Sequence, residues 1–176
     1  MGKLSRNKGA DFERLVAKMF RDSLEAEKDE IMRTPLSGGH SMGDRGDLQV
    51  SARIRSRFPF CVECKHSKEW RPGHFMTKTP GYMEKSWLEQ AAAAAARAVP
   101  NQFPLLVIRG NRTPIYAVFP VAAEESIPLP FVSPYLVFTA ETSPWKYWQM
   151  ILFEDFLSSL AGIPYKKKEG GPHESP

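Results

Sequence analysis

Apolar residues near the start of the chain recur at the spacing of a helix. They form one stripe, made of Phe12, Leu15, Val16, Met19, Phe20 and Leu24. This stripe predicts an amphipathic helix from Asp11 to Leu24. Glu13 lies about 100° from Phe12 around such a helix, so its carboxylate borders the buried stripe and can face a sheet.

β-rich segments after this helix predict three strands before the middle of the chain. A glycine-rich loop separates the first two, and turn residues precede the third. The strands are expected at Ile31–Thr34, Leu48–Val50 and Phe60–Lys65.

The third strand carries two charged residues on one face. Because side chains alternate along a strand, Glu63 and Lys65 share a face while Cys64 points to the other. Asp47 directly precedes the second strand, and a hairpin through residues 53–57 would bring it opposite Glu63. Two carboxylates and a lysine would then meet at one place.

The second half of the chain predicts two helices and two strands. An alanine run favours a helix at Gly81–Val99 that packs closely on a sheet, and strands are expected at Phe103–Arg109 and Ile115–Val121. Ser143 and Pro144 suit the start of a last helix. Its apolar face would consist of Trp145, Trp148, Leu152 and Phe156, as core residues or as a dimer interface.

The length of 176 residues suits one domain with a sizeable core. We expect a single domain over residues 1–164 and a tail over residues 165–176 that has nothing to form a core. No apolar stretch is long enough to span a membrane, and the polar N-terminus does not resemble a signal peptide. The two cysteines, Cys61 and Cys64, would point to opposite faces of a strand, so a shared zinc or redox role is not expected. A cytoplasmic location is the default.

Positive charge is concentrated around the candidate site, although the formal net charge is only +4. Between Arg53 and Lys85 there are eight Lys or Arg residues against three acids, a distribution that favours a nucleic-acid partner. Candidate DNA contacts are Arg6, Lys8, Arg53, Arg55, Arg57, Lys68, Arg71, His74 and Lys78.

Two groups within this basic region admit two interpretations each. The alternating Arg53, Arg55 and Arg57 would share a face of an extended segment and follow a phosphate backbone, or they keep a solvated turn soluble. Trp70 and Phe75 would stack on bases, or wedge them open, at a DNA junction, or they anchor a long loop to the core.

The residue types at the candidate site suit hydrolysis of a phosphodiester. Mg²⁺ prefers oxygen ligands and retains waters, so Asp47, Glu63 and the Cys64 carbonyl could hold it, with Glu13 acting through a water. Lys65 would orient the attacking water or stabilise the developing charge. An isolated Glu-x-Lys is more often a solvated cross-strand pair, so the order of the surrounding elements is what favours a site.

That order resembles the PD-(D/E)xK nuclease superfamily and, within it, the archaeal-type and phage Holliday junction resolvases. The resemblance covers Ser5 to Val121 and implies a restriction-endonuclease-like α/β core in the order α-β-β-β-α-β. A mixed central sheet would be flanked by helices, with the C-terminal helix added. The matching parts are Arg6-Asn7-Lys8-Gly9, Phe12-Glu13-Arg14, Arg33-Thr34-Pro35, Ser37-Gly38, Gly46-Asp47-Leu48, Val62-Glu63-Cys64-Lys65 and Gln90.

The resemblance also implies which residues form the site. They are Glu13, Asp47, Glu63 and Lys65, with Ser37 and Gln90 in supporting positions. Asp44 competes with Asp47 for the aspartate role, and Asp47 is preferred because a strand follows it directly. The implied cofactor is Mg²⁺, with Mn²⁺ as a substitute.

The function implied is a structure-selective endodeoxyribonuclease that resolves four-way DNA junctions by paired nicks. Such enzymes of recombination and repair are two-fold homodimers, because symmetric nicks need two sites in fixed relation; a phage source would fit. The first alternative is another nuclease of the superfamily, of restriction or repair type. The second, from a different class, is a non-catalytic DNA-binding module.

Overall fold

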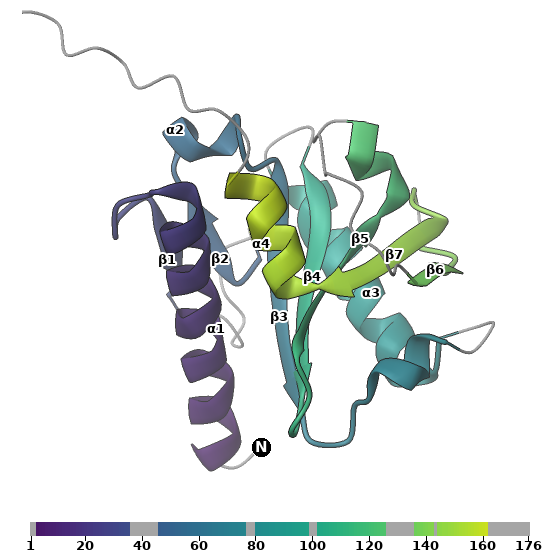
Figure 1. The fold of residues 1–176 in the computed structure, drawn as a ribbon. Coiled ribbons are helices and arrows are strands. Elements are labelled where there is room, and N and C mark those ends of the chain that lie inside the picture. The colour runs from purple at the N-terminus through teal and green to yellow at the C-terminus, as the bar shows by residue number, and fades with distance from the viewer. Residues whose placement is uncertain are drawn as a thin grey trace, which may run out of the picture.

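A five-stranded sheet forms the middle of the structure, a computed structural model (Figure 1). The model describes residues 3–35, 46–76, 80–98, 102–125, 136–142 and 144–161, with backbone only for residues 3–7 and 125. The sheet has the order β3-β4-β5-β7-β6. Its strands are β3 (Phe60–Ser67), β4 (Phe103–Gly110), β5 (Ile115–Pro120), β6 (Leu136–Thr139) and β7 (Tyr147–Leu152).

Helices cover both faces of this sheet. On one face lie α1 (Lys3–Leu24) and α4 (Phe153–Ala161), and on the other lies α3 (Tyr82–Arg97), as Figure 1 shows. β3 and β4 are parallel, whereas the other strand pairs are antiparallel. The predicted restriction-endonuclease-like α/β fold, with a mixed sheet and a C-terminal helix, is therefore confirmed.

A small hairpin lies beside the open edge of β3. It pairs β1 (Ile31–Arg33) with β2 (Leu48–Val50) in antiparallel register. The expected hairpin between β2 and β3 is wrong, because a short helix, α2 (Ala52–Arg55), connects them and the structure pairs β2 with β1. Asp47, directly before β2, hydrogen-bonds to β3.

Aromatic packing holds α1 and α4 on their face of the sheet. Phe20 contacts Phe58, Phe153 and Phe156, and Phe60 contacts Phe156. Burying one such ring stabilises a protein by about 1.5–3 kcal/mol, whereas exposed ion pairs, such as those along α1, contribute about 0–1 kcal/mol. The buried stripe of α1, rather than its surface charge, therefore fixes this helix on the sheet.

The segment between β3 and α3 is anchored to the other face. Trp70 and Phe75 are fully buried, and Phe75 stacks on Phe138 of β6 at 4.8 Å between ring centroids. Phe75 belongs to a 3-10 helix, η1 (Pro72–Phe75). Of the two interpretations for these aromatic residues, the structure thus supports the anchor, since neither ring is available to stack on a base.

The segment predicted to start the last helix is instead the strand β7. Trp148, Gln149, Met150 and Ile151 are all buried, as expected for a strand with neighbours on both edges and helices on both faces. A short apolar run does not distinguish such a strand from a helix. The tryptophan belongs to the core, where Trp148 Nε1 donates a hydrogen bond to Thr142 Oγ1.

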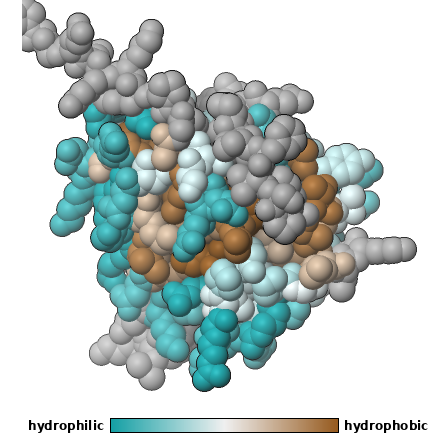
Figure 2. All heavy atoms as spheres, viewed as in Figure 1, coloured by the Kyte–Doolittle hydropathy of each residue, from teal (hydrophilic) through white to brown (hydrophobic). Residues whose placement is uncertain are grey.

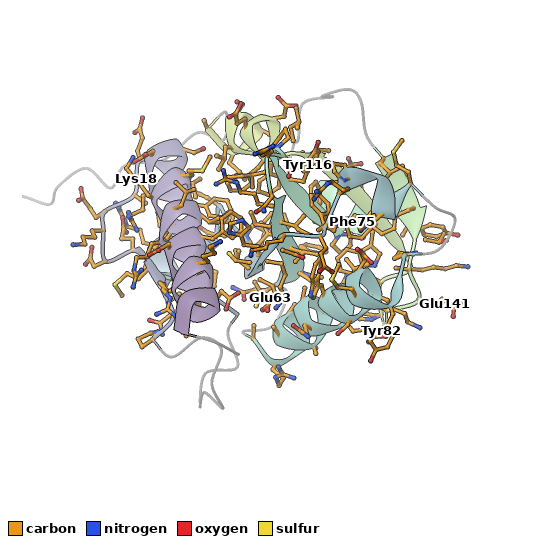
Figure 3. The ribbon with its side chains drawn as sticks, turned by 90° about the horizontal axis from the view of Figure 1, so that it is seen from below. Lys18, Glu63, Phe75, Tyr82, Tyr116 and Glu141 are labelled. Carbon is orange, nitrogen blue, oxygen red and sulfur yellow. The ribbon has the colours of Figure 1, made fainter. Side chains whose placement is uncertain are left out.

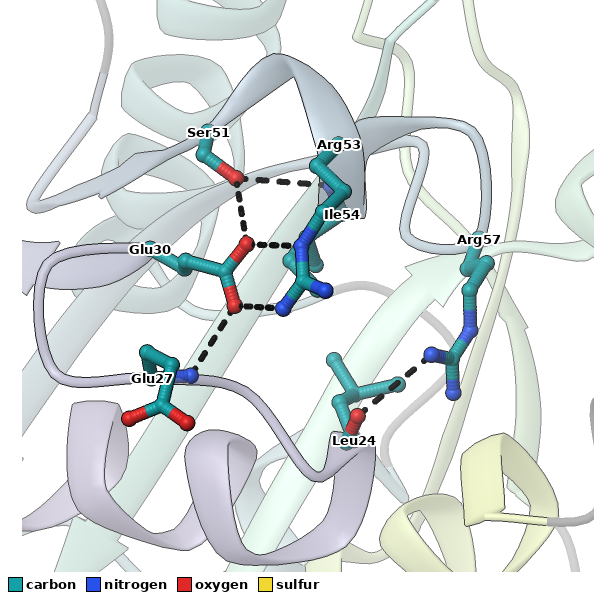
Figure 4. A network of polar contacts seen from close by, with 7 residues as sticks. All are labelled: Leu24, Glu27, Glu30, Ser51, Arg53, Ile54 and Arg57. Carbon is teal, nitrogen blue, oxygen red and sulfur yellow. Dashed lines mark hydrogen bonds and ion pairs between the residues drawn. The ribbon is translucent and has the colours of Figure 1, made fainter. Parts of the chain in front are cut away.

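The expected extended segment of arginines is also wrong, because α2 makes the chain helical there. Arg53 forms a two-pronged ion pair with Glu30, and the Arg57 guanidinium donates to the Leu24 carbonyl (Figure 4). The Arg55 guanidinium donates to the Val50 carbonyl. All three arginines tie α2 and the chain after it to other segments. Their predicted contact with DNA is not tested by this arrangement.

Glu30 is the centre of this network. Its carboxylate is 8% exposed and also accepts hydrogen bonds from the Glu27 backbone and the Ser51 hydroxyl. The hydrogen bonds from Arg53 hold the pKa of Glu30 near 2, against an ordinary value of 4.5. A carboxyl whose folded-state pKa is lowered stabilises the fold above its unfolded pKa, and this stabilisation is lost as the pH falls.

We expect Glu30→Gln to lower the free energy of unfolding by about 1–3 kcal/mol at pH 7, because a charge-assisted pair is lost. Urea denaturation at pH 7 and pH 3 measures this. The difference from the wild type should shrink as the pH falls from 4.5 toward 2, where the wild-type carboxylate itself becomes protonated. Glu27→Gln, on an exposed side chain, is the matched control, and an equal loss in both variants would contradict the prediction.

The remaining boundaries shift by a few residues. α1 begins earlier than predicted, and β3 continues through His66 and Ser67. β6 was not predicted. The tail over residues 165–176 lies outside the described residues. Among the described helices, none is long and apolar enough to cross a membrane.

Candidate active site

Asp47 is held against the edge of β3 by its backbone and its side chain. Its backbone N–H donates to the Val62 carbonyl at 2.7 Å, and its Oδ2 accepts from the Cys64 N–H at 2.8 Å. The N–H and carbonyl of one strand residue point to the same edge, so the Cys64 carbonyl faces the same side as Asp47. A carboxylate and a backbone carbonyl are thus presented together.

Gly46 allows this close approach. Its φ is +71°, and a Cβ atom here would lie 2.4 Å from the Val62 carbonyl oxygen and 3.0 Å from Cys61 Sγ. The Gly46 carbonyl accepts from Thr34 Oγ1 at 2.9 Å. Only glycine combines this positive φ with the absence of a side chain.

Glu63 and Lys65 project from the α3 face of β3. The Lys65 ammonium donates to Glu63 Oε1 at 2.7 Å, and both side chains are largely buried. Viewed from below, Glu63 lies between α1 and α3 (Figure 3). Cys64 points to the opposite face and packs in the core under α1, while Cys61 contacts alanines of α3. The predicted separation of the two cysteines is therefore confirmed.

Glu13 reaches the same region from α1. Its side chain is buried, and Glu13 Oε2 accepts a hydrogen bond from Arg33 Nε of β1 at 2.5 Å. Sequence reasoning assigned no role to Arg33, although it lies in the Arg33-Thr34-Pro35 motif. A carboxylate that borders a buried helix face requires a cation or other donor nearby. This requirement could have identified Arg33 from the sequence as a partner of Glu13.

The carboxylates of the site affect the protonation of Asp47. Burial, followed by the charges of Glu63 and Glu13, raises the pKa of Asp47 to about 7 against an ordinary value of 3.8. The Cys64 hydrogen bond and the Lys65 charge oppose this rise but do not overcome it. The positive charge near Asp47 is thus too small to offset the repulsion from the other carboxylates, and a bound cation would offset it.

The donor set suits an ion that retains several waters. Among the described residues, no group of three or more His, Cys, Asp or Glu side chains converges as a complete metal cage. Glu13 is engaged by Arg33, and Glu63 by Lys65. Two carboxylates, one carbonyl and waters fit Mg²⁺, which rarely uses an all-protein cage.

Of the two supporting residues, only Gln90 is described, and its hydrogen bond is made outside this group. Gln90 is exposed on α3, and its side chain donates to Ser86 one turn earlier. Ser37 lies outside the described residues, as does Asp44. Their predicted roles stay predictions.

The predicted DNA contacts differ in their surroundings. Lys8 and Lys68 are exposed. Arg71 donates to the carbonyls of Lys68 and Trp70, and His74 Nδ1 lies 2.8 Å from Glu84 Oε1. Lys78 and the side chain of Arg6 lie outside the described residues. None of these contacts tests binding to DNA.

The chain was also compared with known proteins. Residues 4–141, more than half of the chain, match the model of a family described as "Phage putative PDDEXK endonuclease". No curated protein and no solved structure matches the chain.

Proposed function

Because this chain belongs to the phage putative PDDEXK endonuclease family, we propose that it is a Mg²⁺-dependent nuclease that resolves four-way DNA junctions by paired nicks. The observation that carries the nuclease assignment is that Asp47 is hydrogen-bonded to the Cys64 N–H on the strand that also bears the Glu63–Lys65 pair. The resemblance of residues 5–121 to archaeal-type and phage resolvases supports the junction as substrate. Mn²⁺ would substitute for Mg²⁺.

Asp47 and Glu63 would hold the metal ion together with the Cys64 carbonyl. When bound, Mg²⁺ supplies positive charge at the scissile phosphate and lowers the pKa of a water. Glu13 would act through a water, and Arg33 orients the Glu13 carboxylate for this role. The hydrogen bond from the Cys64 N–H fixes Asp47 before substrate arrives, so little reorganisation is needed.

Two cations of the described residues form ion pairs with the proposed site carboxylates. Arg33 pairs with Glu13, and Lys65 pairs with Glu63. The Lys65 ammonium at 2.7 Å from Glu63 Oε1 would orient the attacking water or stabilise the charge that develops on the phosphate oxygens. Lys65 is therefore the proposed catalytic cation.

Paired nicks on two strands require two such sites in fixed relation, so the proposal includes a two-fold homodimer. Sedimentation equilibrium with and without a four-way junction measures the assembly. A protein that stays monomeric on the junction and nicks only one strand would contradict the homodimer but not the nuclease activity.

The decisive assay compares a synthetic four-way junction with a linear duplex of the same sequence, with Mg²⁺, with Mn²⁺ and with EDTA. We expect symmetric cleavage of the junction with either metal and none with EDTA. Equal cleavage of both DNAs would reject the resolvase and favour a restriction or repair nuclease of the same superfamily. Binding without hydrolysis of any DNA would favour the non-catalytic DNA-binding module.

A further inference from the structure

Basic side chains from three elements gather where α1 begins and where β3 and β4 end. Lys8 comes from α1, His66 from β3 and Arg109 from β4. These three elements reach the lower end of the molecule in Figure 1, and Figure 2 shows hydrophilic side chains at that end. The active-site residues described above do not include any of the three.

Strand register and helix spacing bring these side chains to one face. His66 and Arg109 are register partners in the parallel pair of β3 and β4, so both side chains extend to the same face of the sheet. The Phe12 ring of α1 contacts the imidazole of His66 at 5.6 Å between centroids. Lys8 precedes Phe12 by one helical turn and therefore lies on the same side of α1.

The cations of this group lie close to one another. Arg109 and Lys8 are near enough to His66 for their charges to act on its ring, and the Asn111 side chain hydrogen-bonds to that ring. No carboxylate of the described residues forms an ion pair with Lys8 or Arg109. Lys8 and His66 are exposed, and Arg109 is half-buried. Cations held together in this way attract an anion from solution.

The position relative to Glu13 indicates which anion. His66 lies on the α1 face of β3, the side from which Glu13 reaches the active site, whereas Glu63 projects from the other face. Lys8 is five residues before Glu13, which corresponds to about 7.5 Å along the axis of α1. One DNA strand advances about 3.4 Å per nucleotide along the helix axis, so a strand bound at Glu13 has neighbouring backbone phosphates within reach of this group. Phosphate contacts of this kind fix the register of a bound strand.

We propose that Lys8, His66 and Arg109 form a binding site for one backbone phosphate of the DNA that the active site cuts. This inference rests on the proposed nuclease function and adds to it how the strand is positioned. The Asn111 amide orients the imidazole, and the two permanent cations supply the charge. Lys8 was expected to contact DNA from the sequence, whereas His66 and Arg109 were not.

The test measures DNA binding in EDTA, where no metal-dependent cleavage occurs, as a function of salt. Because the group holds one phosphate, the double variant Lys8→Gln/Arg109→Gln should reduce the slope of log affinity against log salt by about 0.9 on duplex DNA, and each single variant should reduce it by part of that amount. The double variant should bind about tenfold more weakly or worse at moderate salt. Lys18→Gln is the matched control on α1, since Lys18 is exposed, pairs with Asp22 and lies on the outer side of the helix (Figure 3).

A second measurement locates the phosphate. Neutral methylphosphonate groups are placed one at a time along the DNA strand, and binding of the wild type and of Arg109→Gln is compared. One position should weaken the wild type and leave Arg109→Gln unaffected. An effect spread evenly over all positions, or slopes for the variants equal to that of Lys18→Gln, would overturn the site.

The outcomes separate this inference from the proposed function. If the protein binds DNA with the expected slopes and position but never cleaves it, the nuclease fails and the phosphate site stands. If it cleaves junctions while Lys8→Gln and Arg109→Gln behave like Lys18→Gln, only the phosphate site fails. Should Arg109→Gln prove poorly folded by circular dichroism, the exposed Lys8→Gln alone decides.

Discussion

Asp47→Asn is expected to reduce the rate of DNA cleavage by about 10³-fold or more while the protein binds DNA as well as before. The asparagine oxygen can still accept from the Cys64 N–H, so the local geometry is kept. The loss is the negative charge proposed to hold the metal ion, and such electrostatic terms are among the largest in catalysis. Single-turnover cleavage of a four-way junction and fluorescence anisotropy in EDTA measure the two quantities.

The same variant should be at least as stable to heat as the wild type at pH 7. The raised pKa of Asp47 means that its charged form is disfavoured in the folded protein, and asparagine removes that charge. Loss of activity together with an equal or higher melting temperature separates a site residue from a structural one. Asp22→Asn, on the exposed surface of α1, should change neither the cleavage rate nor the melting temperature.

A wild-type cleavage rate for Asp47→Asn would contradict the assignment of this aspartate. Asp44→Asn is the companion variant, since Asp44 competes for the same role in the sequence. If Asp44→Asn alone abolished cleavage, the metal site would have to be rebuilt around that residue.

Gly46→Ala is expected to have the second largest effect, because it damages the fold and the site together. The left-handed backbone costs a residue with a Cβ atom about 1–2 kcal/mol, and the contact of 2.4 Å with the Val62 carbonyl forces the chain away from β3. We therefore expect the free energy of unfolding to fall by about 2 kcal/mol or more. Displacement of Asp47 should also lower cleavage by about 10²-fold even where the variant is fully folded.

Gly73→Ala is the matched control for this substitution. A Cβ atom at Gly73 meets nothing within 4 Å, so stability and cleavage should stay near wild-type values. Urea denaturation and single-turnover cleavage serve for both variants. If Gly46→Ala cleaved DNA normally while folded, the close approach of Gly46 to β3 would not be what positions Asp47.

The elements around the site were predictable because each has a strong local pattern. The stripe of α1 placed Glu13 at the border of the core, and strand alternation placed Glu63 and Lys65 on one face of β3. Both inferences use only the period of a helix or a strand. The order of elements could then be matched to a family fold without knowledge of any contact.

The parts that failed depend on partners distant in the chain. β7 is a strand because β5 and β6 pair with it on both edges, which its own apolar run does not reveal. The arginine segment, predicted to be extended, forms the helix α2, and its Arg53 pairs with Glu30, which lies 23 residues earlier in the chain. The pairing of Arg33 with Glu13 likewise joins β1 to α1 across 20 residues. Such contacts form only once the chain has folded, so periodicity does not encode them.

The place of β3 at the margin of the sheet also bears on self-association. An edge strand offers free N–H and carbonyl groups to which another chain can add a strand, and natural proteins block this with charge or with local cover. Asp47 Oδ2 takes the Cys64 N–H that an added strand would need, and Glu63 and Lys65 place charges beside it. The candidate catalytic residues thus also disfavour the addition of another strand at this edge. Asparagine is a better replacement for Asp47 than alanine, because its side-chain oxygen can still accept the Cys64 N–H.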